Sequence, residues 1–88
     1  MNISNIIEVI VLELFEEFQK DYQLNCTCDQ CKNDILALAL NNIPPKYVAT
    51  DKGEILIKAL YSDIQKKRGI MKELAVAATT VEKNPNHY

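Results

Sequence analysis

The fold is decided by residues 26–45, which read CTCDQCKNDILALALNNIPP. Three cysteines come first, an apolar run over residues 35–40 follows, and Pro44-Pro45 closes the segment. A helix that is apolar all round is typical of a buried, central position. Proline ends such a helix, because its nitrogen carries no hydrogen and its ring pushes the preceding residue out of helical space. We predict a central helix over residues 32–42 with Asp29 as its N-cap, then an extended linker over residues 44–49.

The residues before the cysteines predict an amphipathic helix over residues 5–22. Asn5, followed three residues later by Glu8, resembles a capping box. Apolar residues recur at steps of three and four and are Ile7, Val11, Leu14, Phe18 and Tyr22. Further apolar residues widen this face beyond a narrow stripe. A face of that width indicates burial on two sides, one of them against a partner chain.

The C-terminal part predicts one long helix over residues 51–82, opened by Thr50 or Asp51. Its apolar seam repeats every seven residues at Ile57, Ile64, Met71 and Ala78. The register is unchanged across Gly69, whereas a turn would normally reset it. At 1.5 Å per residue such a helix is roughly 48 Å long, while a compact chain of this size is about 30 Å across. The overhang again indicates a homodimer.

Length, charge and the lack of long apolar runs limit the kinds of protein that this chain can be. It has 88 residues, which predicts a single domain over residues 1–88, and a net charge of −2. That charge argues against a dedicated nucleic-acid-binding surface. We find neither a targeting segment nor an apolar run of membrane-spanning length, so we expect a cytoplasmic protein without membrane contact. The expected fold is an all-α small helical domain with a long C-terminal helix.

The cysteines predict a zinc knuckle between the first two helices. Cys26, Cys28 and Cys31 offer three thiolates in one loop, and zinc favours four sulfur or nitrogen ligands in a tetrahedron. The single histidine, His87, is the candidate fourth ligand, from the same or the other subunit, with Asp29 or water as alternatives. A thiol redox site and functionally idle cysteines stay open as other interpretations. An iron–sulfur cluster is disfavoured, because it usually takes four cysteines.

Catalysis is not expected from this sequence. One terminal histidine leaves nothing to activate a serine, and two glycines cannot form a glycine-rich phosphate loop. A zinc ion with four protein ligands would also have no open position for a substrate.

The central segment resembles the late-competence ComFB family. The residues that carry the resemblance are the three cysteines, Asn33-Asp34, the apolar run to Asn41, and Pro44-Pro45-x-Tyr47-Val48. The resemblance implies a small helical homodimer that binds zinc through cysteines and is not an enzyme. This chain lacks the C-terminal cysteine of the competence branch, and His87 stands near that place. Other branches resemble cyclic dinucleotide receptors and share the segment from Ala39 to Tyr47.

A dinucleotide site is the second function that the residues allow. Lys46 supplies a cation for phosphate, Tyr47 a ring for base stacking, and Thr50 a helix start that favours anions. Arg68 belongs to the one basic run of the sequence. The plainer interpretation is that Tyr47 packs on the core and the cations are solvated. We therefore expect a non-enzymatic, zinc-stabilised dimeric regulatory protein with a protein partner. The alternatives are a c-di-GMP or c-di-AMP receptor and a thiol redox switch.

Overall fold

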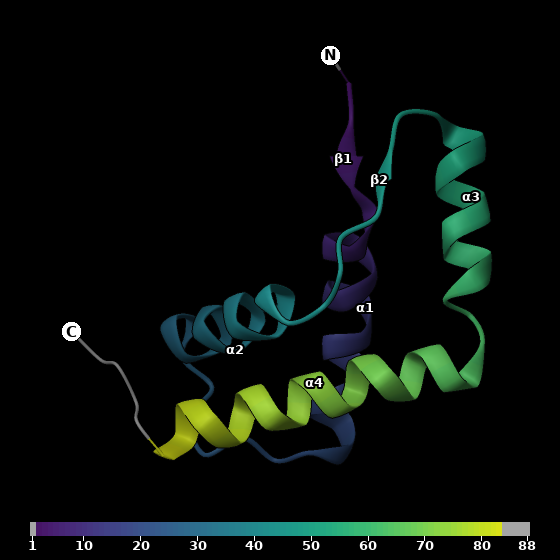
Figure 1. Ribbon diagram of the computed structural model, residues 1–88. Helices are drawn as coiled ribbons and strands as arrows, with labels where there is room; N and C mark the ends of the chain where they lie inside the picture. The colour runs from purple at the N-terminus through teal and green to yellow at the C-terminus, as the bar shows by residue number, and fades with distance from the viewer. Residues whose placement is uncertain (1, 84–88) are drawn as a thin grey trace.

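The computed structural model describes residues 2–83, and Figure 1 shows their arrangement. The chain is mostly helical, as predicted, and adds one short pair of strands. The elements in order are β1 (Ser4–Asn5), α1 (Ile6–Asp21), α2 (Asp29–Asn41), β2 (Tyr47–Val48), α3 (Asp51–Leu60) and α4 (Ile64–Lys83). None of the helices within this range is long and apolar enough to cross a membrane.

The core lies where α1, α2 and α4 pack against one another. The largest fully buried side chains come from all three helices and are Ile7, Val11, Ile35 and Leu74. Burying one such side chain contributes about 1.5–3 kcal/mol. Small residues at the contact, Ala39 on α2 and Ala77 and Ala78 on α4, are also fully buried and let the helices approach closely. The prediction that the second helix is central is confirmed, although half of its apolar run is only partly buried.

Asn5 joins the start of α1 to the linker that follows α2. Its side-chain Oδ1 accepts hydrogen bonds from the backbone N–H groups of Ile7, at 3.2 Å, and Lys46, at 2.9 Å. The Ile6 N–H donates to the Lys46 carbonyl at 2.8 Å, and Ser4 and Asn5 pair antiparallel with Val48 and Tyr47. Asn5 is thus the N-cap, as predicted, but the predicted linker also contains a strand. The paired residues of the two strands are 42 and 44 positions apart in the chain, so local patterns did not reveal the strand pair.

The predicted single helix over residues 51–82 is wrong, because the chain turns between α3 and α4. The Ser62 and Asp63 N–H groups bond three residues back, to the Ala59 and Leu60 carbonyls, and the Ser62 hydroxyl donates to Ala59 at 2.6 Å. The Asp63 Oδ1 then accepts from the Gln65 N–H at 3.4 Å, as an N-cap does. The turn inserts no extra residue into the seven-residue spacing of the apolar residues, although the chain changes direction there. The spacing alone therefore could not reveal the turn. The helix does run unbroken through Gly69.

One helix start differs from the prediction by a few residues, and another agrees with it. Helix α2 begins at Asp29, and its N-cap is Cys28, whose sulfur accepts from the Cys31 N–H at 3.4 Å. Asp29 is therefore inside the helix, where its carboxylate favours the positive end of the helix dipole. For α3 the structure selects Thr50, whose Oγ1 accepts from the Gly53 N–H at 3.0 Å.

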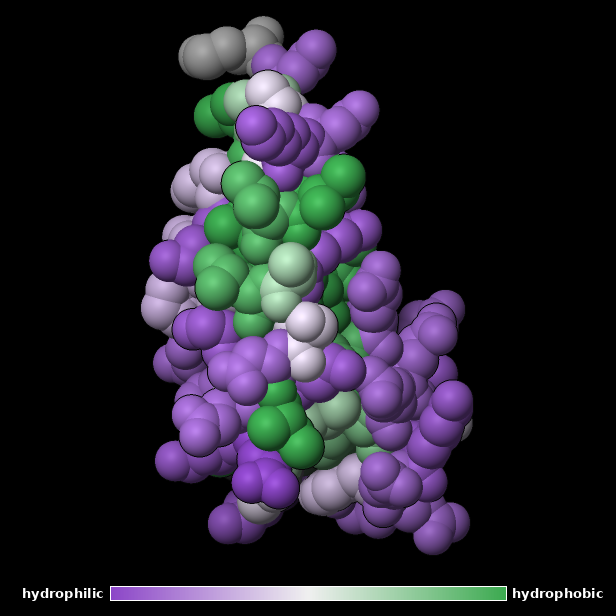
Figure 2. Space-filling model, turned by 90° about the vertical axis from the view of Figure 1, so that its right-hand side faces the viewer, coloured by the Kyte–Doolittle hydropathy of each residue, from purple (hydrophilic) through white to green (hydrophobic). Residues whose placement is uncertain are grey.

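Helix α3 stands apart from the packed core. No residue of α3 is buried, and its outer face carries large apolar side chains. Ile55 is 67% exposed, and Leu56, Leu60 and the neighbouring Ile64 are exposed by more than half. Figure 2 shows hydrophobic surface on the side of the molecule where α3 lies in Figure 1. We call these four residues the α3 face.

Replacing Asn5 by alanine tests its double role. The variant Asn5→Ala loses the helix cap and the bond to the linker, so we expect a free energy of unfolding lower by about 1–3 kcal/mol in urea titrations. Asn5→Asp keeps the accepting oxygen and should stay within about 0.5 kcal/mol of the parent. An equal decrease of the free energy of unfolding in both variants would show that the accepting oxygen of Asn5 does not stabilise the fold.

Candidate metal centre

The three cysteines meet in the loop between α1 and α2. Their sulfur atoms all lie within 4.8 Å of one another, and those of Cys26 and Cys28 are 3.3 Å apart. Cys28 is exposed, Cys26 is half-buried, and Cys31 faces the core with 3% of its surface exposed. The start of α2 explains the arrangement, because Cys28 caps the helix and Cys31 lies in its first turn. The local fold thus gathers the three predicted ligands.

Hydrogen bonding makes two of the thiols chemically different. The Cys31 N–H donates to the Cys28 sulfur and, with a further bond from Cys26, lowers the pKa of Cys28. A hydrogen bond between the Cys31 and Cys26 side chains, followed by burial, raises the pKa of Cys31 to about 12. Cys31 therefore holds its proton at neutral pH until a cation displaces it.

The sulfur geometry fits a zinc ion. Zn–S bonds of about 2.3 Å in a tetrahedron place sulfur atoms roughly 3.8 Å apart. The Cys26 and Cys28 sulfur atoms are 3.3 Å apart and no pair is more than 4.8 Å apart, so small side-chain movements would bring the three thiols to zinc-binding distances. Within residues 2–83, this is the one group of three or more His, Cys, Asp or Glu side chains that could hold a metal ion. Asp29 is not part of this group. His87, the predicted fourth ligand, lies outside the described residues.

A hydrogen bond ties the cysteine loop to the end of α4. The Asn25 side chain, next to Cys26, donates its Nδ2–H to Glu82 Oε2 at 2.8 Å. Figure 1 shows the end of α4 lying beside the loop between α1 and α2. His87 follows Glu82 by five residues, which span at most roughly 17 Å when extended. Sequence analysis missed Asn25 and Glu82, because residues 57 positions apart give no local signal.

Comparison with known proteins shows the family of this chain. The family model "Late competence development protein ComFB" matches residues 4–85. The "Competence protein ComFB" of Bacillus subtilis (strain 168) is 35% identical over 79 residues, which cover 90% of this chain and 81% of that protein. This chain belongs to the ComFB family. The solved structure of the late competence protein ComFB from Bacillus subtilis matches this fold with a TM-score of 0.86 at 34% identity, over 96% of this chain and 92% of that one.

The other candidate residues of this ComFB-family chain do not share one cavity. Lys46 and Tyr47 are exposed beside the strand pair, and Tyr47 does not pack on the core, since 66% of its surface is accessible. Thr50 lines a cavity of about 380 Å³ at the start of α3, with Ser4, Asp51 and Glu54. Arg68 lines a different cavity of about 450 Å³ between α1 and α4. Lys46, Tyr47 and Thr50 are neighbours in the sequence, whereas Arg68 of the same chain lines a different cavity.

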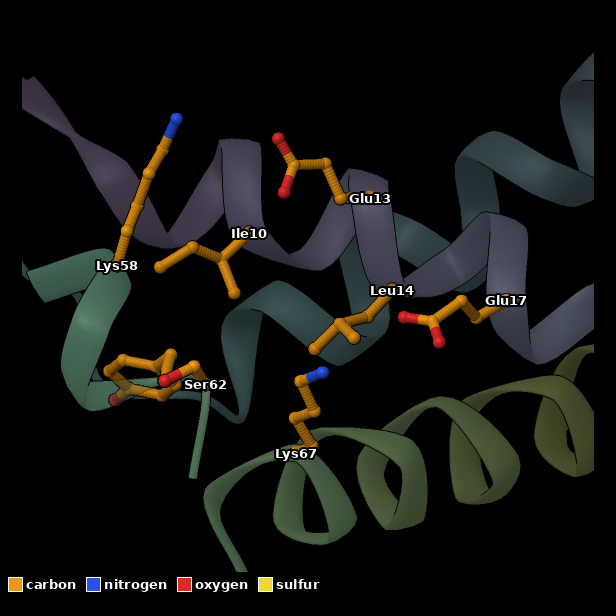
Figure 3. Close-up of a pocket in the computed structure, with 8 residues that line it drawn as sticks. Ile10, Glu13, Leu14, Glu17, Lys58, Ser62 and Lys67 are labelled. Atoms are coloured by element: carbon orange, nitrogen blue, oxygen red, sulfur yellow. The ribbon is translucent and has the colours of Figure 1, made fainter. Parts of the chain in front are cut away.

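A third cavity, of about 220 Å³, separates α3 from α1 and α4. Figure 3 shows Glu13 and Glu17 of α1 on one side, and Lys58 and Lys67 on the other, around apolar side chains of α1. Lys58 pairs with Glu54 of its own helix at 3.3 Å. Because its two carboxylates balance its two lysines, the cavity has no net positive charge to attract a phosphate ligand. It marks the gap at which α3 separates from the core.

Proposed function

We propose that this ComFB-family chain is a zinc-stabilised, dimeric regulatory module of a single domain, with no catalytic activity of its own. The observation that carries the proposal is the group of three sulfur atoms within 4.8 Å of one another. A core this small leaves thin stability, because a short chain hides a modest share of its surface. A metal and a second subunit would each add to it. The name of the Bacillus subtilis relative supports a role in competence.

In this proposal Cys26, Cys28, Cys31 and His87 hold one zinc ion. The bond between Asn25 and Glu82 supports His87, because it brings the end of α4 to the cysteine loop. Closing the ring from residue 26 to residue 87 would restrict the unfolded chain and so stabilise the folded one. Four protein ligands leave no open zinc position, which is why we propose a structural rather than a catalytic ion. Reduced thiols also require a reducing compartment, so the proposal places the protein in the cytoplasm.

Zinc removal tests this proposal directly. Protein purified under reducing conditions should hold one zinc ion per chain by elemental analysis. A chelator should lower the melting temperature by more than about 10 °C, since a ligand at 1,000 times its Kd adds about 4.1 kcal/mol. Affinity should rise as the pH is raised from 6 to 8, because protonated thiols such as Cys31 must release their protons to bind.

Matched variants in the same loop separate ligation from loop structure. Cys28→Ser should lose the metal, whereas Thr27→Ala, also exposed and next to Cys28, should keep it. Purified protein without metal would contradict the zinc site. Loss of zinc with disulfide formation under mild oxidant would favour the redox switch instead.

The proposed dimer uses the α3 face. Helices shorter than about 12–15 residues are marginal alone, and α3 has 10 residues with none buried. Burying the four apolar side chains of the face would contribute about 1.5–3 kcal/mol each. The charges of α3 suit a two-fold antiparallel pair, because Asp51 and Glu54 lie at its start and Lys58 near its end. The overlong helix that first indicated a dimer does not exist, so the exposed face of α3 replaces that argument.

A charge placed in the α3 face should break the dimer. We expect Leu56→Asp to elute as a monomer in size-exclusion chromatography with light scattering, while the parent elutes at twice the 10.0 kDa chain mass. Val76→Asp is the matched control, since Val76 is an apolar residue of α4 that is 53% exposed and lies outside this face. A monomeric parent, or a Leu56→Asp dimer of unchanged affinity, would contradict the interface.

The second candidate function is a c-di-GMP or c-di-AMP receptor. The exposed ring of Tyr47 favours it, since a tyrosine that only packed on the core would be buried. Lys46 beside it supplies a cation. Thr50 opens α3, where the helix dipole favours anions, and Lys46 would have to offset the carboxylates of Asp51 and Glu54 that line the same cavity. Arg68 would have to come from the partner subunit, which a two-fold dimer permits.

A thermal-shift titration tests the receptor function. At 100 times its Kd, either dinucleotide should stabilise the protein by about 2.7 kcal/mol. Tyr47→Ala should remove the shift, and Tyr47→Phe should keep it, because stacking requires the ring and not the hydroxyl. A flat response of the parent protein over the whole concentration range would exclude this function.

A further inference from the structure

A groove of about 450 Å³ lies between the end of α1 and the middle of α4, away from the cysteine loop and from the α3 face. Figure 1 shows α4 crossing the end of α1 at this place. The apolar lining of the groove consists of Phe18 and Tyr22 from α1 and Met71 and Ala75 from α4. The rings of Phe18 and Tyr22 stack with their centroids 4.8 Å apart. Aromatic rings beside a flexible thioether form a surface that packs well against apolar side chains of different shapes.

The lining of the groove belongs to the core but is not fully covered. Phe18 is a core residue with 7% of its surface exposed. Tyr22, Met71 and Ala75 pack against the core and are half-buried. Apolar side chains that stay accessible and gather in one hollow, rather than singly over the surface, are typical of a binding surface.

The rim of the groove is basic. Arg68 and Lys72 line it together with one carboxylate, that of Asp21. The one ion pair among residues 2–83 joins Lys58 to Glu54, so neither cation of the rim is paired there. Arg68 and Lys72 are four residues apart on α4, a spacing that brings two like charges together and destabilises a helix. The stability of α4 therefore does not explain this pair of cations.

The charges and the lining indicate what the groove binds. An apolar hollow with a basic rim is complementary to an acidic segment that carries an apolar side chain, and aromatic residues, methionine and arginine are enriched at protein interfaces. A two-fold pairing of the groove with itself would bring Arg68 and Lys72 of both copies together, which like charges disfavour. A nucleic acid fits less well, because the lining is apolar and the chain has a net charge of −2.

We infer that the groove between α1 and α4 is the docking site for an acidic peptide segment of a partner protein. An apolar side chain of that segment packs on Tyr22 and Met71, and its carboxylates pair with Arg68 and Lys72. This inference gives the regulatory role of the proposed function a partner and rests on that role. It requires neither the zinc ion nor the α3 face.

Selection from a random peptide library displayed on phage, with the full-length protein as the target, tests this inference. The enriched peptides should combine acidic residues with an aromatic or aliphatic side chain. A synthetic, fluorescently labelled copy then gives the Kd by fluorescence anisotropy. This affinity should fall as the salt concentration is raised from about 0.05 to about 0.5 M, because salt screens the rim charges.

Variants of the groove locate the binding site. Arg68→Glu should weaken peptide binding by about tenfold or more, because it replaces an attraction by a repulsion. Met71→Gln should weaken it as well, since the apolar contact is lost, and circular dichroism checks that this variant folds. Lys83→Glu is the matched control, because Lys83 is an exposed cation of α4 that does not line this groove. It should bind the peptide like the parent.

A charge exchange gives the sharpest measurement. The double variant Arg68→Glu, Lys72→Glu should lose the acidic peptide and bind a copy of it in which lysines replace the acidic residues. The parent protein should show the opposite preference. Zinc content and elution volume of these variants should equal those of the parent, so a failure of this inference is distinguishable from a failure of the zinc site or of the dimer.

Four results would overturn the inference. The first is a selection that enriches no peptide, and the second is a selected peptide that binds Arg68→Glu as tightly as the parent. A third is a change from dimer to monomer in Met71→Gln, which would assign the groove to a second copy of this chain. The fourth is a single-stranded oligonucleotide that displaces the peptide from the parent, which would assign it to a nucleic acid.

Discussion

The packing of α2 against α4, with α1 packed on both helices, is the contact on which the rest of the structure depends. Ile35 and Ala39 of α2 meet Leu74, Ala77 and Ala78 of α4 in a core with no buried polar or charged residue among those described. Three of these residues are alanines, so the helix backbones lie close and a larger side chain there would push them apart. Because α2 is fixed, the loop before it and the linker after it are fixed as well.

The proposed metal site and the proposed nucleotide-binding residues lie near opposite ends of α2. At its start, the Cys28 cap and Cys31 in the first turn bring the sulfur atoms together, and Asn25 joins this loop to α4. At its end, the linker pairs with β1 through Asn5 and leaves Tyr47 exposed. One helix therefore positions the three clustered thiols at its start and, through the linker, the exposed ring of Tyr47 and the cation of Lys46 after its end.

Helix α3 shows the opposite behaviour, because it contributes nothing buried to the core of one chain. Its exposed leucine and isoleucine side chains lie on the far side of a gap lined by Glu13, Glu17, Lys58 and Lys67. An amphipathic helix placed in this way is typical of a surface that is completed by another chain. The proposed zinc ion and the proposed second subunit would thus act at different places, the first at the cysteine loop between α1 and α2 and the second on α3.

The sequence by itself determined the helical class, the ends of α1, the central place of α2 and the three clustered thiols, because each is encoded by residues close together in the chain. Cysteines within one turn of a helix start must meet, and prolines must end a helix. Only the tertiary structure decided the break between α3 and α4, the strand pair and the bond between Asn25 and Glu82. The break between the two helices is stabilised by the side chains of Ser62 and Asp63, which hydrogen-bond to nearby backbone groups. The seven-residue spacing of apolar residues is the same with or without this turn, so the spacing did not reveal it. The strand pair joins residues 42 and 44 positions apart, and the bond from Asn25 to Glu82 joins residues 57 positions apart. Residues so distant in the chain come into contact only when the helices pack together.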